Sequence, residues 1–119
     1  MIYSCNLQQR HFQNVSKGSK RFEMRPYRDK WTNINVNDIL KISEVDMNNK
    51  KTGNIIYCLV KAAIQCSSFR DALEAFNLDR LLPYGNFVSD GLILYGKIYG
   101  DLINKKSEVV VFRLKVILD

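Results

Sequence analysis

The eight residues GSKRFEMR, numbered 18–25, combine a glycine-led turn with a short strand that carries three cations and one carboxylate. Because alternate side chains of a strand point to opposite faces, we expect Arg21, Glu23 and Arg25 to share one face. The apolar residues between them then face a core, and Lys20 lies where the turn becomes strand. A charged cluster on a rigid strand suits an anionic ligand that accepts hydrogen bonds.

Hydrophobic patterning on both sides of this stretch predicts strands joined by short helices. Strands are expected over residues 2–7, 22–25, 39–45, 55–65 and 108–118, and helices over 8–16, 69–76 and 91–98. Gly18 ends the first helix, and Ser67 or Ser68 can cap the second. Five strands, with helices between the fourth and fifth, favour a closed or nearly closed barrel, because closure removes exposed edges.

The composition is typical of a soluble globular protein, with 46% hydrophobic and 25% charged residues among 119. We expect a single domain over residues 1–119. No apolar run approaches the roughly 18 residues of a membrane span, and the first residues lack the pattern of a signal peptide. These features predict an intracellular, cytoplasmic protein without a membrane partner, and they leave its oligomeric state open.

The cysteines and the single histidine argue against a metal site or another cofactor. Cys5, Cys58 and Cys66 are odd in number and include no Cys-x-x-Cys pair. We interpret all three as small buried residues.

Positive charge is concentrated at the start of the chain. Residues 1–30 hold seven Lys or Arg against two acids, whereas residues 31–119 hold eleven against ten, within a net charge of +6. This asymmetry indicates a basic face that attracts phosphates. The alternative is that the charge serves solubility alone.

Four features of the sequence follow one another in a recognisable order. GSKRFEMR has the form Gly-x-Lys-x-x-Glu-x-Arg, and Val36-Asn37-Asp38 stands where a Val-Gly-Asp turn would precede an apolar strand. Asn tolerates the left-handed conformation of that glycine better than most residues. The sequence continues with a leucine-rich segment (68–74 and 81–83), a helix with Tyr95 and Tyr99, and a closing strand.

In this order, the features resemble the ASCH domain, a small β-barrel family related to the PUA RNA-binding fold. The resemblance implies an α+β fold, a five- to six-stranded PUA/ASCH-like barrel with flanking short helices. It also implies a cleft floored by the strand 20–25 and walled by helices. Members are thought to act on RNA or modified nucleosides: some bind nucleic acid, some resemble ribonucleases and some resemble acetylcytidine amidohydrolases.

Lys20 and Glu23 are the candidate catalytic residues. A desolvated Lys20 near another cation would have a lowered pKa and could act as a general base, or it could simply contact phosphate. Glu23 could accept hydrogen bonds from a base edge or a catalytic water, or pair with Arg25 or Arg21. The amidohydrolase branch has threonine at the position of Glu23, so the resemblance gives weak support for that activity in this chain. Asp90 is one candidate for the catalytic carboxylate of that branch.

Cations, aromatic side chains and the glycine of the motif are the candidate ligand-binding residues. They are Lys17, Gly18, Arg21, Arg25, Arg28, Lys30, Trp31 and Tyr95. Trp31 could stack on an unpaired base or fill a core position.

Two classes of function fit these residues best. The leading interpretation is an RNA- or nucleotide-binding domain that uses the basic cleft around residues 18–25. The alternative is a metal-independent hydrolase, a ribonuclease or a modified-nucleoside amidohydrolase, with Lys20 as its central residue. A third interpretation is a protein-interaction domain whose basic face meets an acidic partner.

Overall fold

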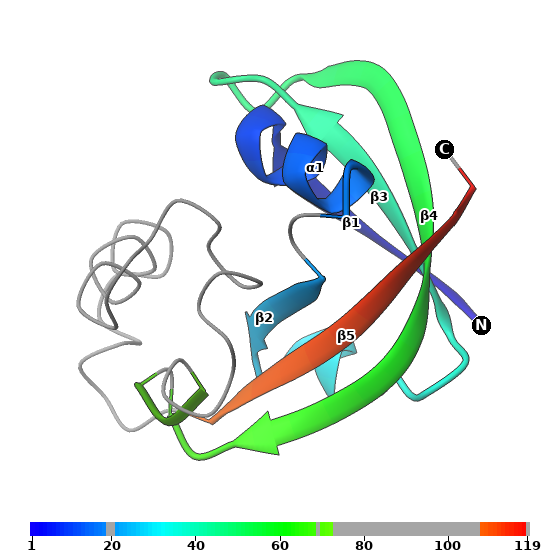
Figure 1. Ribbon diagram of the computed structural model, residues 1–119. Coiled ribbons are helices and arrows are strands. Elements are labelled where there is room, and N and C mark those ends of the chain that lie inside the picture. Colours follow the sequence, from blue (N-terminus) through cyan, green and yellow to red (C-terminus); the bar gives the residue numbers. More distant parts are fainter. Residues whose placement is uncertain (19–20, 69, 73–107, 119) are drawn as a thin grey trace.

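The computed structural model describes residues 1–18, 21–68, 70–72 and 108–118, which form a curled five-stranded sheet and two short helices (Figure 1). The elements are β1 (Ile2–Gln8), α1 (Gln9–Ser16), β2 (Phe22–Pro26), the 3-10 helix η1 (Asp29–Thr32), β3 (Ile39–Val45), β4 (Lys51–Cys66) and β5 (Val109–Leu118). The α+β class and the expected strands are confirmed, although β4 begins earlier than predicted. No described helix has the length and apolar character needed to cross a bilayer.

The strands lie in the order β1-β3-β4-β5-β2, with β1 parallel to β3 and the other pairs antiparallel. The sheet curls into a half-barrel whose edge strands are β1 and β2 (Figure 1). Side chains bridge toward β1: Arg25 Nη2 donates to the Asn6 carbonyl at 3.2 Å, and Lys30 Nζ donates to the Ser4 carbonyl. We call this side-chain junction the seam; the barrel is nearly closed there.

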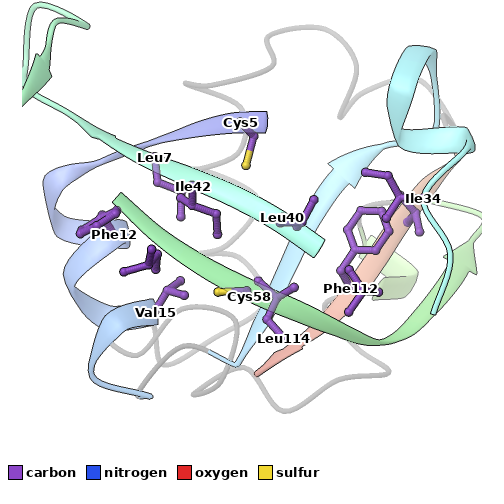
Figure 2. Packing of buried hydrophobic residues seen from close by; sticks show 13 residues of the cluster. Cys5, Leu7, Phe12, Val15, Ile34, Leu40, Ile42, Cys58, Phe112 and Leu114 are labelled. Carbon is purple, nitrogen blue, oxygen red and sulfur yellow. The ribbon is translucent and has the colours of Figure 1, made fainter. Parts of the chain in front are cut away.

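The hydrophobic core fills the concave side of the sheet, and α1 covers one end of it. Phe12 and Val15 of α1 are buried and lie in one cluster with Leu7 and Ile42 (Figure 2). The buried cluster comprises Cys5, Leu7, Phe12, Val15, Ile34, Leu40, Ile42, Ile56, Cys58, Val60, Val110, Phe112 and Leu114. Every strand but β2 contributes to this cluster.

Both faces of β2 are buried, which the alternation of its residues does not reveal. Met24 is fully buried, as predicted, opposite Val111 of β5. Glu23 pairs with Phe112 and therefore lies on the same face of the sheet as the main core, since directly opposed residues share a face. The carboxylate of the motif consequently points inward, although Arg21 on the same face of the motif is exposed.

Two predicted turns and one predicted cap are confirmed. Gly18 follows α1 with φ +80°, and Asn37 has φ 75°, so both adopt the left-handed conformation. Ser68 Oγ accepts the N–H of Asp71 at 3.1 Å, which caps the helical residues 70–72. The rest of the helix expected over 69–76, and the helix expected over 91–98, lie outside the described residues.

The three cysteines are unpaired thiols in different environments. Cys5 and Cys58 are buried, as expected, but Cys66 is half-buried, so that part of the prediction is wrong. Burial raises the pKa of Cys5 to about 11, although Arg25 partly opposes the shift, and burial raises the pKa of Cys58 to about 12. Both buried thiols are therefore protonated at neutral pH and are poor nucleophiles.

Candidate functional site

The seam carries an open pocket of about 540 Å³. We call it the seam pocket. It is lined by Ser4, Cys5, Asn6, Arg25, Lys30, Trp31, Lys41, Ser43 and Lys51. Four of these nine residues are cations and none is acidic, so the pocket suits an anion.

Trp31 is the aromatic residue in the lining of the seam pocket. Its ring centroid lies 4.8 Å from Arg25 Cζ and 5.0 Å from Lys30 Nζ, distances at which cations are attracted to an aromatic ring. The same ring is half-buried and packs 6.0 Å, centroid to centroid, from Phe112. Trp31 therefore packs against the core, and its indole also contacts the two cations.

Glu23 is a buried carboxylate behind the seam, only 4% exposed. Its Oε1 atom accepts the backbone N–H of Met24 at 3.1 Å and lies 3.7 Å from Arg25 Nε, so the expected pairing with Arg25 is confirmed. Its Oε2 atom is buried without a hydrogen-bond partner among the described residues. Burying such an oxygen costs free energy, which makes it a feature of functional interest.

A second basic pocket of about 350 Å³ opens where the end of α1 meets β4 and β5. We call it the mouth pocket. It is lined by Val15, Ser16, Lys17, Gly18, Arg21, Lys61, Arg113, Leu114, Lys115 and Val116. Half of these residues are cations, none is acidic, and none lines the seam pocket.

The predicted site residues are therefore divided between two pockets. Lys17, Gly18 and Arg21 line the mouth pocket, whereas Arg25, Lys30 and Trp31 line the seam pocket. The division arises because the motif is an extended strand, whose first and last residues lie far apart.

The remaining predicted residues fall in neither pocket. Arg28 is exposed and lines neither of them. Lys20, Tyr95 and Asp90 lie outside the described residues, so the cleft expected between the motif strand and the later helices lies partly outside them too.

Five cations of the two pockets were not among the predicted site residues. They are Lys41 and Lys51 in the seam pocket, and Lys61, Arg113 and Lys115 in the mouth pocket. The alternation of Arg113 and Lys115 with apolar neighbours does indicate an outward face of β5. What the sequence does not reveal is which strands pair, and so which cations become neighbours. Within the described ranges, no three His, Cys, Asp or Glu side chains cluster as metal ligands would.

Comparisons with known proteins identify solved structures that have a similar fold. No family model and no curated protein matches the chain. The solved structure of the hypothetical protein PH0355 is 26% identical with a TM-score of 0.80, covering 98% of this chain and 100% of its own. Protein PF0455 from Pyrococcus furiosus is 25% identical with a TM-score of 0.72, covering 98% of both chains.

An ASCH structure is also similar, at much lower sequence identity. The ASCH protein from Zymomonas mobilis is 13% identical with a TM-score of 0.59, over 96% of this chain and 66% of that one. At this identity the likeness concerns the fold, and it agrees with the curled half-barrel described above. The chain therefore has the ASCH-type, PUA-like barrel fold that the order of its motifs predicted.

Proposed function

We propose that residues 1–119 form a single ASCH-type domain that binds RNA or nucleotides through the cations around residues 18–25. The observation that carries the proposal is the seam pocket, whose described lining combines four cations with one aromatic ring and includes no acidic residue. Cations grouped in this way neutralise phosphates and release counterions, which is the main source of affinity for nucleic acids.

Two of the four cations of the seam pocket, Arg25 and Lys30, are suited to fixed phosphate contacts. Arg25 is oriented by its hydrogen bond to the Asn6 carbonyl and by the Trp31 ring. Lys30 is oriented by the same ring and by the Ser4 carbonyl. Because these side chains are already ordered, less conformational entropy is lost when they bind a ligand.

The environment of Trp31 favours contacts to phosphate and sugar over base stacking. Its ring is half-buried, is near two cations and packs against Phe112. Phosphate contacts position a nucleic acid without reading its sequence. We therefore expect weak sequence preference.

The test is fluorescence anisotropy with a labelled oligouridylate, titrated at several salt concentrations. Binding should weaken steeply with salt, and Lys41→Gln/Lys51→Gln should reduce the slope of log K against log salt by about 1.4, or about 0.7 per lost contact. Lys50→Gln removes an exposed cation from the β3–β4 turn, outside both pockets, and should leave the slope almost unchanged. Absence of binding at low salt would refute the proposal.

A hydrolase is the second candidate, and the unpartnered Oε2 atom of Glu23 favours it. A carboxylate oxygen without a donor is available to orient a water or to accept a proton, and Lys20 precedes it by three residues in the motif. The protein should be incubated with RNAs and modified nucleosides and the products identified by mass spectrometry. Turnover that survives both Lys20→Ala and Glu23→Gln would remove these residues from any mechanism.

A further inference from the structure

The mouth pocket concentrates positive charge without a described carboxylate to balance it. Its five cations come from the end of α1, the residue before β2, and strands β4 and β5. The ion pairs among the described residues join Met1 to Asp38 and Arg25 to Glu23, so none involves a mouth cation. Like charges on neighbouring strands are destabilising, which makes this cluster a cost to the fold unless an anion occupies it.

A β-bulge in β4 contributes to this concentration. Val60 pairs with Leu114 and Ala62 pairs with Arg113, so Lys61 is the additional residue between two consecutive rungs of the ladder. A bulge re-aims the side chain that it carries, and bulges are frequent beside binding sites. Here the re-aimed residue is a lysine that joins two cations of β5.

Backbone hydrogen bonds fix the frame of the mouth pocket. Arg21 is attached to β5, because the N–H of Leu114 donates to its carbonyl at 2.8 Å. On the other wall, Gly18 turns the chain with φ +80°, and its N–H donates to the Val15 carbonyl at 3.0 Å. The cations are thus mounted on ordered backbone, which is the arrangement that lowers the entropic cost of binding.

We propose that the mouth pocket is a second phosphate-binding site, and that one RNA strand occupies it together with the seam pocket. The idea that one RNA strand occupies both pockets rests on the proposed function. Arg21 and Arg25 are four residues apart in an extended segment, which corresponds to about 13 Å. A short oligonucleotide therefore reaches one pocket, and a longer strand reaches both and gains affinity from their linkage.

The first test uses pyrophosphate, which examines the site without RNA. Pyrophosphate should produce saturable shifts in the backbone amide NMR signals of Gly18, Lys61 and Arg113. The variant Arg113→Gln/Lys115→Gln should abolish saturation, whereas the matched seam variant Lys41→Gln/Lys51→Gln, which loses the same charge, should retain it. Absent shifts, or shifts equally affected by both variants, would overturn the second site whether or not the protein binds RNA.

The second test varies the length of an oligouridylate over about 4–16 nucleotides, the range that single small barrels cover. The wild-type protein should gain at least about tenfold in affinity with length, and Arg113→Gln/Lys115→Gln should lose most of that gain. An unchanged gain would overturn the shared strand while leaving RNA binding at the seam intact. A wild-type protein that binds pyrophosphate but no RNA would instead refute the proposed function and, with it, the shared strand.

Discussion

The seam pocket and the mouth pocket have similar charge but hold their cations in different ways. In the seam pocket, Arg25 and Lys30 donate to carbonyls near the β1 edge and lie over Trp31. In the mouth pocket, no described side-chain hydrogen bond or ion pair involves a cation. The difference indicates that Arg25 and Lys30 stabilise the barrel as well as attract a ligand, whereas the mouth cations make no described contact of this kind.

The largest effect on stability should come from Arg25→Met, which removes the cation beside buried Glu23. Breaking a buried pair leaves an uncompensated charge, so we expect the free energy of unfolding to fall by about 3–5 kcal/mol. Urea denaturation followed by circular dichroism measures this change.

The control for this prediction is the double variant Glu23→Gln/Arg25→Met. Neutralising Glu23 removes the uncompensated charge, so the double variant should be clearly more stable than Arg25→Met alone. If the free energy of unfolding of Arg25→Met fell by less than about 1 kcal/mol, Arg25 would not stabilise the seam.

Trp31→Ala should have the next largest effect and should lower the free energy of unfolding by about 3 kcal/mol. The substitution opens a cavity beside Phe112 and removes the aromatic ring that contacts two cations. Trp31→Phe retains an aromatic ring and should lose less. Circular dichroism is the appropriate probe, since Trp31 is the only tryptophan. Equal losses in the two variants would argue against a role for the ring in holding the cations.

Local features of this fold could be predicted from the sequence because each has a local physical cause. The strand over 39–45 follows from its apolar pattern, and the turns at Gly18 and Asn37 follow from residues that tolerate positive φ. The ASCH-type barrel was predicted because four features of the sequence, in order, resemble the ASCH family.

Features that depend on pairing between distant strands could not be predicted in the same way. The inward position of Glu23 is set by Phe112, its partner in β5, and the bulge at Lys61 is set by the register of β4 against β5. The motif therefore indicated which of its residues carry charge, but not that a strand buried on both faces would divide them between two pockets. Lys41 joins the seam pocket through the pairing of β1 with β3, which sets it opposite Ser4, and Lys51 joins it from β4, opposite Val45 of β3.

A smaller effect on stability should come from the ionisation of two buried thiols, those of Cys5 and Cys58. Cys5 lines the seam pocket. The folded-state pKa values of the two thiols, about 11 and about 12, lie above the ordinary value of 9.0. The unfolded chain therefore releases these protons first as pH rises. The stabilisation is fully present well below pH 9.0, begins to be lost as pH approaches that value, and disappears as pH rises toward the folded values.

Together the two thiols should lower the free energy of unfolding by about 1 kcal/mol between about pH 7 and about pH 9. Urea denaturation at the two pH values measures the fall, and Cys5→Ala should retain about half of it because one titrating group remains. A fall of the same size in Cys5→Ala as in the wild type would contradict the assignment to Cys5.

The smallest effect, and the one with the opposite sign, should come from the mouth variant Arg113→Gln/Lys115→Gln. Because these exposed cations repel their neighbours, their loss should leave stability unchanged or raise it by up to about 0.5 kcal/mol at low salt. Added salt should remove the gain, since it screens exposed charges. Urea denaturation at low and high salt measures both effects. A loss of more than about 1 kcal/mol would mean that the mouth cations, like those of the seam, hold the barrel together, and the contrast between the two pockets would disappear.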